Sequence, residues 1–178
     1  RRVVVTDKSV LRPGGISVLE AKILPMLESL DLTRDLRELV HLAADRSTLD
    51  DVLRRGLDAL ARIVKYDLGV VFVLDRGRLV SRVARGALAD SRVNDVTLDL
   101  AKFPSIREAL DSRRARAFLE TDHAHGEGDP FDGVLDFPHG HSCMVVPLCA
   151  GENCFGVMTL DRNICEAYPK ETVDLVDV

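Results

Sequence analysis

The sequence predicts an α+β fold in which helices flank a central antiparallel sheet. Amphipathic helical segments precede residue 67, and short apolar runs separated by turn signals follow from residue 68 to 162. A last helical pattern begins at residue 170. Because strands fill the middle and helices lie at both ends, we expect the terminal helices on one face of the sheet. A short helix and a long loop should cover a pocket on the other face.

The composition is that of a globular domain. Of the 178 residues, 46% are hydrophobic and 30% are charged, which is enough apolar material for a core. The net charge of −5, without a basic and aromatic cluster, argues against direct contact with nucleic acid. No apolar run is long enough for a membrane span and no signal-peptide pattern is present, so we expect a cytoplasmic protein. We divide the chain into an N-terminal extension, residues 1–34, and one main domain, residues 35–178.

Two helices are predicted before the sheet. Residues 35–46 carry a stripe of apolar side chains with helical spacing, formed by Leu36, Leu39, Val40 and Ala43. In the next helix, residues 48–66, Ser47 or Thr48 is the expected N-cap, and Asp50 and Asp51 lie in the first turn. Its apolar face consists of Leu49, Val52, Leu53, Leu57, Leu60 and Val64.

The predicted strands begin at residue 68. Residues 68–75 are almost continuously apolar, which is typical of a strand buried on both faces. Arg76-Gly77 marks a turn, and residues 78–86 alternate as the hairpin partner. The further expected elements are strands at 95–100, 116–120, 142–149 and 154–162 and a short helix at 103–113. The helix that follows Pro169 runs to the last residue, so we expect it to be truncated.

The hairpin at residues 144–162 carries the most specific pattern. Its Pro147, Leu148, Gly156, Val157 and Leu160 resemble the hairpin near the end of GAF domains, a family of small-molecule sensor modules. With the patterns at residues 48–86 and 103–120, the resemblance covers roughly residues 48–178. Residues 128–148 are further similar to the sensory GAF domains of sigma-54-dependent transcriptional activators.

This resemblance implies a regulatory sensor of a bacterial transcriptional activator and not an enzyme. A ligand in the pocket would alter the packing of the terminal helices, through which the domain would also form a homodimer. Downstream ATPase and DNA-binding domains are expected in the full-length protein. The alternatives are a structural dimerisation module without ligand, paired through the stripe at Leu36 and Leu39, and a metal or redox sensor using non-haem iron or thiols.

The resemblance also implies where a ligand lies, between the sheet and the covering segment of residues 103–138. We expect polar anchors and apolar walls from Phe103, Arg107, Phe118, Phe131, Phe137, His139, His141 and Met144. The same phenylalanines could instead fill the space completely. The identity of the ligand and any cofactor stay unassigned.

The loop at residues 122–141 offers a metal site as a second interpretation. His123 and His125 are two residues apart, as are His139 and His141, and such pairs point to one side of an extended strand. Imidazoles among carboxylates suit iron, zinc or manganese. Some sigma-54-dependent activators with GAF sensors hold a mononuclear non-haem iron that binds nitric oxide. From the turn-forming Gly and Asp residues we nevertheless expect a pocket lid first, with well under one equivalent of metal.

The cysteines and the remaining acid–base pairs predict no catalysis. Cys149 and Cys154 flank a four-residue turn and should lie opposite each other, as free buried side chains or, alternatively, as a redox pair. We interpret Asp161-Arg162 as a local ion pair or turn. The enzymatic alternative is a thiol-dependent reductase using Cys143, Cys149 or Cys154, which are not next to a basic residue that would lower a thiol pKa.

Overall fold

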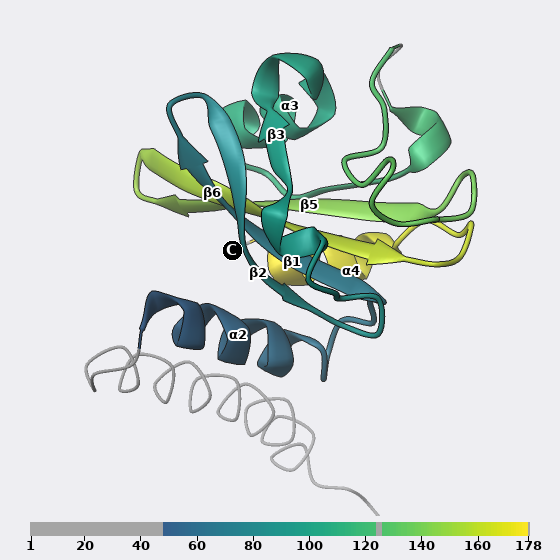
Figure 1. The fold of residues 1–178 in the computed structure, drawn as a ribbon, viewed down its shortest axis with the longest axis horizontal. Coiled ribbons are helices and arrows are strands. Elements are labelled where there is room, and N and C mark those ends of the chain that lie inside the picture. Colours follow the sequence, from purple (N-terminus) through teal and green to yellow (C-terminus); the bar gives the residue numbers. More distant parts are fainter. Residues whose placement is uncertain (1–47, 124–125, 178) are drawn as a thin grey trace, which may run out of the picture. The chain divides into compact units, whose positions relative to one another are not determined.

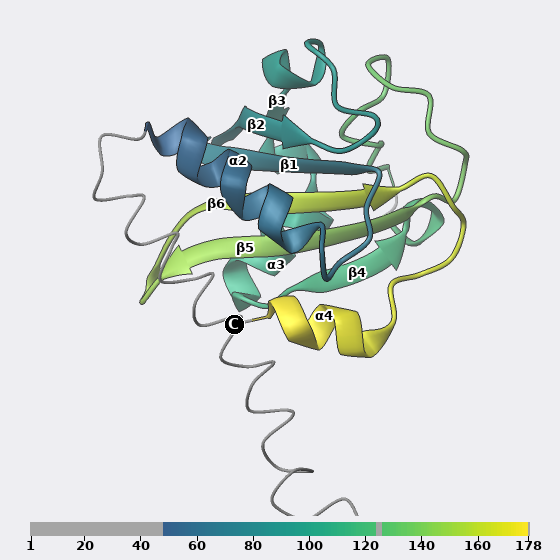
Figure 2. The ribbon, with the colours of Figure 1, turned by 90° about the horizontal axis from the view of Figure 1, so that it is seen from below.

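The computed structural model describes residues 48–123 and 126–177. They form a six-stranded antiparallel sheet with the strand order β3-β2-β1-β6-β5-β4, flanked by three α-helices. Figure 2 shows α2 and α4 lying across one face of this sheet, with α3 on the other side (compare Figure 1). The predicted α+β class and the placement of the helices are therefore confirmed. The extension, the helix expected at 35–46 and His125 lie outside the described residues.

The helix α2 (Leu49–Leu60) begins where its sequence predicts. Thr48 is the N-cap and forms a capping box with Asp51. The helix ends at Leu60 and not at the expected residue 66, because the chain turns there toward the sheet. The Leu57 carbonyl, which accepts the Ala61 N–H at 2.9 Å, also accepts the Tyr66 hydroxyl at 2.7 Å, and this second bond ties the end of the helix to the segment that leads into the sheet.

The centre of the sheet follows the predicted periodicity. β1 (Leu68–Asp75) is buried along its first five residues, and β2 (Arg78–Arg85) alternates between exposed and buried positions. The turn between them places Arg76 and Gly77 at φ of 49° and 80°, as a two-residue hairpin with a right-handed twist requires. The short edge strand β3 (Thr97–Asp99) pairs with β2.

The second half of the sheet is built from β4 (Arg116–Leu119), β5 (Ser142–Ala150) and β6 (Asn153–Arg162). The helix α3 (Pro104–Ser112) precedes β4 and starts with proline in its first turn, and α4 (Lys170–Val176) follows β6. Gly156 lets β6 approach β1, since a Cβ atom there would lie 2.0 Å from the Phe72 carbonyl oxygen. No helix within the described ranges combines the length and the apolar character that crossing a bilayer requires.

One irregularity sets the register of the β5–β6 hairpin. Next to the turn, Ala150 pairs with Asn153 and Cys149 with Cys154. The register then shifts by one residue, and beyond the shift Cys143 lies opposite Asp161. Directly opposed residues of an antiparallel pair point to the same face, so this bulge places a thiol beside a carboxylate.

The turn end of the same hairpin corrects the expectation for the cysteines. Cys149 and Cys154 are joined in a disulfide and are partly exposed, whereas free buried thiols were favoured. Their positions directly opposite each other across the turn bring the two sulfurs together. The disulfide lies six residues along β5 from Cys143, about 20 Å away at the rise of a strand. It is therefore separate from the buried thiol.

Two apolar cores lie on the two faces of the sheet. The helix-side core joins the sheet to α2 and α4, and its fully buried members include Leu57, Val64, Met144 and Leu160. The loop-side core joins the sheet to α3 and the loop, and its members include Phe72, Ile106, Phe131, Val145 and Val157. Along β5 the side chains alternate between the two cores, with Met144 on the helix side and Val145 on the loop side.

Candidate functional site

Four side chains with metal-binding chemistry meet at one end of β5 and β6. They form what is called here the buried cluster, which consists of His141, Cys143, Asp161 and Asp129. The Nε2 atom of His141 lies 3.3 Å from Cys143 Sγ, 3.3 Å from Asp129 Oδ2 and 3.8 Å from Asp161 Oδ1. His141 is 1% exposed and Asp161 4% exposed. One imidazole atom is thus the meeting point of a thiol and two carboxyl groups.

Strand spacing, the hairpin register and one loop turn explain how these groups reach the same point. His141 and Cys143 are two residues apart at the start of β5, so they point to the same face of the sheet. Asp161 joins them through the shifted register of the hairpin. Asp129 comes from the loop, where its Oδ1 accepts the Phe131 N–H at 2.6 Å in a local turn and leaves Oδ2 for His141.

The imidazole of His141 is held by its neighbours. The Phe137 ring stacks on it at 4.4 Å between centroids and 15° between planes. Glu120, in the short 3₁₀ segment Glu120–Asp122, accepts the Gly140 N–H at 2.9 Å, and its own backbone N–H donates to the His141 carbonyl. Phe137 therefore holds the ring and Glu120 holds the backbone on either side of it, as a preorganised site requires.

Burial dominates the electrostatics of the buried cluster. It raises the pKa of Asp161, of Asp129 and of the Cys143 thiol, each of which loses hydration in its charged form. For His141, burial acts to lower the pKa, but the carboxyl groups of Asp161 and Asp129 outweigh it and raise the value. Within the described residues, neither Asp129 nor Asp161 forms an ion pair with lysine or arginine. If the two carboxyl groups and the thiol of the cluster were all deprotonated, their negative charge would exceed the single positive charge of a protonated His141.

The arrangement fits a metal cation. The ligand atoms of His141, Cys143 and Asp161 all lie within 4.8 Å of one another, and Asp161 Oδ2 is buried without a hydrogen-bond partner. Bond lengths of about 2.0–2.3 Å from nitrogen, oxygen and sulfur to iron or zinc would let one ion reach such a set after small adjustments. The mixture of imidazole, thiol and carboxylate excludes the oxygen-preferring ions magnesium and calcium.

A small, mostly enclosed cavity, called here the closed cavity, adjoins the buried cluster. It has a volume of about 10 Å³, enough for roughly one water-sized molecule. Cys143 and Asp161 border it on the cluster side, and its remaining wall includes Phe118, His123 and Thr159. A ligand in this cavity would therefore touch the groups that could hold a metal.

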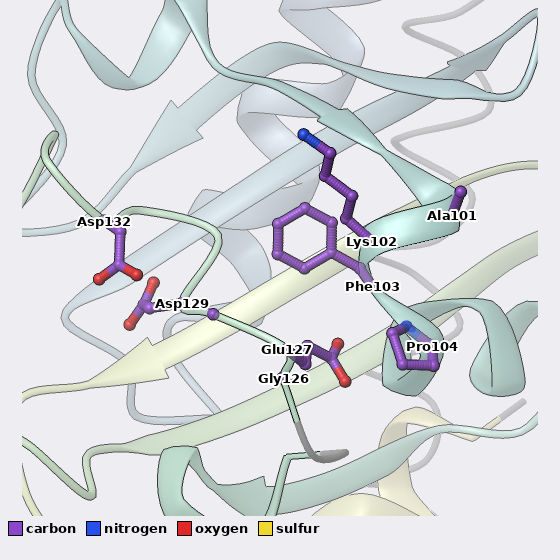
Figure 3. A pocket seen from close by; sticks show the side chains of 9 residues that line it. Ala101, Lys102, Phe103, Pro104, Gly126, Glu127, Asp129 and Asp132 are labelled. Atoms are coloured by element: carbon purple, nitrogen blue, oxygen red, sulfur yellow. The ribbon is translucent and has the colours of Figure 1, made fainter.

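A larger, open pocket lies on the outer side of the loop. Its volume is about 450 Å³, and Figure 3 shows Lys102, Phe103 and Pro104 on one side of it and the loop from Gly126 to Asp132 on the other. Phe103, an expected pocket wall, borders it. Asp129 and Glu127 border it too, and Glu127 also borders the closed cavity. The loop thus separates an open surface pocket from an internal one.

The structure brings together part of the ligand-binding set predicted from sequence. Phe118 borders the closed cavity, Phe137 stacks on His141, and Phe131 fills the loop-side core at 1% exposure. Met144 alternates with Cys143 along β5 and therefore belongs to the helix-side core. It also borders the closed cavity. Arg107 is exposed on α3 and borders neither pocket.

The structure does not form the chelating pair predicted from His139 and His141. His139 is 85% exposed and its Nδ1 lies 2.9 Å from Glu120, so it points away from the buried His141. The turn through Gly140, with φ of 80°, breaks the extended geometry that the pairing assumed. His123 borders the closed cavity. Its partner in the other pair, His125, is not among the described residues.

Asp161 is the site residue that sequence reasoning missed, whereas Cys143 is already one of the candidate thiols of the reductase alternative. Asp161 is buried beside His141 and is not a local ion pair with Arg162, whose guanidinium instead lies over the Tyr168 ring. The spacing His-x-Cys at the start of a strand could have predicted that His141 and Cys143 lie together, since residues two apart in a strand point to the same face. The partner on β6 had no such signal, because its position depends on the bulge.

Comparisons with known proteins give the family and the fold. A family model for the GAF domain matches residues 48–178. The chain is similar to the GAF domain of a phosphoenolpyruvate-protein phosphotransferase from Coxiella burnetii, at 14% identity and a TM-score of 0.61, covering 83% of this chain and 89% of that chain. It is also similar to the GAF domain of a two-component sensor histidine kinase from Bacillus halodurans, at 19% identity and a TM-score of 0.58, covering 73% and 86%.

A third similar structure is an enzyme. It is the type II free methionine-R-sulfoxide reductase of Thermoplasma acidophilum, at 18% identity and a TM-score of 0.56, covering 72% of this chain and 84% of that chain. At these identities the likeness concerns the fold alone. No curated protein matches the chain in sequence.

Proposed function

The chain belongs to the GAF domain family, and on this premise we propose that it senses a small molecule through a metal ion held in the buried cluster. GAF domains are small-molecule sensory and regulatory domains of signalling proteins, and they are generally not catalytic. The observation that carries the proposal is the convergence of Cys143, Asp129 and Asp161 on His141 Nε2. No lysine or arginine of the described residues balances the two carboxyl groups.

The donor set suits ferrous iron or zinc, because both accept imidazole, thiolate and carboxylate together. We propose iron, the metal of the sigma-54-dependent activators that hold a non-haem iron in a GAF sensor. When bound, the ion supplies a positive charge to the carboxyl groups and a coordination position for a small ligand. Cys143 and Asp161 would hold it from the sheet, His141 from the strand entry, and Asp129 from the loop. The Phe137 ring and Glu120 keep the imidazole in place while ligands exchange.

The closed cavity supports a very small ligand. Its volume of about 10 Å³ admits a diatomic molecule but not a metabolite with a ring or chain. Nitric oxide is one such molecule. Residues 128–148 resemble the sensory GAF domains of sigma-54-dependent activators, and some of those activators hold a non-haem iron that binds nitric oxide. The larger pocket of Figure 3 would then serve as an approach to the site and not as the site itself.

The response would pass through β5 and β6 to the helices. Cys143 and Asp161 alternate along their strands with Met144 and Leu160, which are fully buried in the helix-side core. Tightly packed cores transmit small displacements, so a shift at the cluster would alter how α2 and α4 pack. In a cytoplasmic transcriptional activator this change would control ATPase and DNA-binding domains, with homodimerisation through the terminal helices.

A thiol-based reaction is less well supported. Burial raises the pKa of Cys143, so the thiol stays protonated near neutral pH in the absence of a metal and is a poor nucleophile. The disulfide between Cys149 and Cys154 lies at the far end of the hairpin. We therefore propose a sensor and not a reductase.

Metal content tests the proposed function. Protein without affinity tag or chelator, purified without oxygen and supplied with ferrous iron, should contain about one equivalent of metal per chain by elemental analysis. His141→Ala should lose the metal, and the matched control His139→Ala should keep it, since His139 is exposed on the other side of Gly140. Wild-type protein with well under one equivalent would refute the metal centre and leave the lid or the ligand-free dimerisation module.

A further inference from the structure

Unpaired buried polar atoms gather around the closed cavity. Seven buried side-chain nitrogen and oxygen atoms of the described residues lack a hydrogen-bond partner. Four of them belong to residues that border this cavity, namely both ring nitrogens of His123, Thr159 Oγ1 and Asp161 Oδ2. Folded proteins pair almost all buried polar atoms, so a concentration of exceptions at one place indicates a missing binding partner.

Neither His123 nor Thr159 is accounted for by the metal centre. His123 is not part of the group of ligand atoms within 4.8 Å of one another. A neutral threonine hydroxyl is not among the usual ligands of iron or zinc. Both residues nevertheless border the cavity together with Cys143 and Asp161. They are therefore placed to contact what the metal would bind, and not the metal.

The two residues are held in fixed positions. The His123 ring meets the Phe118 ring edge-on, with centroids 4.7 Å apart and planes at 81°. Thr159 is 3% exposed on β6, two residues before Asp161, and so points to the same face of the sheet. The nearby Thr159 hydroxyl acts to lower the pKa of the Asp161 carboxyl group, so a ligand would gain this hydroxyl once a metal ion holds Asp161. The His123 ring nitrogens have no hydrogen-bond partner to give up.

We propose that His123 and Thr159 bind the small ligand itself, as a polar wall of the cavity that hydrogen-bonds its outer atom. This inference rests on the proposed function and adds the residues that determine specificity. The ligand class is a neutral diatomic or triatomic molecule with an acceptor atom, because the imidazole N–H and the hydroxyl are the donors that face it. An apolar molecule of the same size would leave these donors unpaired and would be rejected.

Near-isosteric substitutions test the proposal with nitric oxide as the probe. Thr159→Val keeps the shape and removes the hydroxyl, His123→Leu removes the imidazole, and His123→Gln restores an N–H donor. In iron-loaded protein, Thr159→Val and His123→Leu should each bind nitric oxide about threefold to tenfold more weakly, the expected effect of one lost hydrogen bond. His123→Gln should recover part of the affinity, and Ile106→Val, an apolar change in the same wall, should have little effect.

Two further measurements separate the possible failures. Elemental analysis should show unchanged iron in all four variants, and infrared spectra should show a shifted N–O stretching frequency only where a donor is lost. Loss of iron in His123→Leu would overturn the proposal by making His123 a metal ligand. Full iron with unchanged affinity and frequency would overturn it while leaving the proposed function intact. If wild-type protein binds no metal, both the proposed function and this inference are refuted.

Discussion

The two faces of the sheet differ in how their buried polar groups are paired. On the face covered by α2 and α4, both tyrosine hydroxyls donate to backbone carbonyls, Tyr66 to Leu57 and Tyr168 to Lys65. On the face covered by α3 and the loop, His123, Thr159 and Asp161 keep buried polar atoms without partners. The unpaired atoms on the helix side, Arg85 Nε and Arg162 Nε, belong instead to guanidinium groups that make other contacts. Unpaired buried groups reduce stability, so the cluster on the loop side is a centre that a bound ion or ligand would stabilise.

This difference separates stability from binding along single strands. Met144 and Leu160 pack against the helices, while Cys143 and Asp161, their immediate neighbours, face the cavity. Substitutions on the two faces should therefore have different effects. Those on the helix side should lower the free energy of unfolding, and those on the loop side should weaken the binding of the metal ion and its ligand.

The largest effect is expected on the helix face. Leu57→Ala removes a side chain that is 1% exposed in the helix-side core, and should lower the free energy of unfolding by about 2–5 kcal/mol. Denaturant titration measures the loss, with Leu175→Ala on α4, 47% exposed, as a control expected to change little. The folded Leu57→Ala protein should still contain its full equivalent of iron. Loss of the metal from this variant would show that the faces are not separable.

The next effect concerns metal-dependent stability on the loop face. Ferrous iron at 100 times its dissociation constant should add about 2.7 kcal/mol to the stability of wild-type protein. Asp161→Asn should remove most of this gain, because it takes the charge from a ligand that is 4% exposed. Asp136→Asn, a change of an exposed loop carboxylate, should keep it. Thermal unfolding with and without iron measures both, and an equal gain in the two variants would contradict the assignment of Asp161.

Metal affinity should also fall as the pH falls. Burial raises the pKa of the Cys143 thiol, so the metal-free protein carries the proton near neutral pH and must release it to bind as thiolate. With one proton released per ion, affinity should drop about tenfold, or about 1.4 kcal/mol, for each unit of pH lost. Calorimetry in buffers of different ionisation enthalpy counts the protons. Affinity independent of pH would mean that the thiol is not a ligand.

Sequence patterns predicted the elements well because their signals are local. The Thr48 cap, the Arg76-Gly77 turn and the proline at the start of α3 each act within a few residues. The buried cluster depends instead on the bulge between Leu148 and Cys149. If the pairing next to the turn continued unchanged, Leu160 would lie opposite Cys143, and Asp161 would point to the other face.

The histidines were misjudged for a related reason. The i, i+2 rule was applied to His139 and His141 as though the strand began before them, but β5 begins at Ser142. Gly140, with φ of 80°, turns the chain between the two side chains. The same rule is correct for His141 and Cys143, where only one residue precedes the strand. A spacing rule holds only within the element to which it belongs, and sequence alone places such boundaries poorly.

The smallest effect is expected from a substitution of Glu127, which links the loop to the start of α3 by hydrogen bonds to Ser105. Glu127 accepts hydrogen bonds from the Ser105 hydroxyl at 2.7 Å and the Ser105 N–H at 3.1 Å, and Figure 3 shows its side chain turned toward the start of α3. It borders both the open pocket and the closed cavity, so the ligand path passes beside this contact. Glu127→Gln keeps the shape but weakens two charge-assisted bonds, by about 1 kcal/mol in total.

The expected result of Glu127→Gln is faster exchange with little loss of stability. If opening of this contact limits access, about 1 kcal/mol corresponds to a roughly fivefold faster removal of iron by a chelator. Glu152→Gln, in the exposed β5–β6 turn, changes the charge equally and should leave the rate unchanged. Stopped-flow measurement with a coloured chelator decides between them. Equal rates in both variants would mean that ligands reach the buried cluster by another path, and that Glu127 only caps α3.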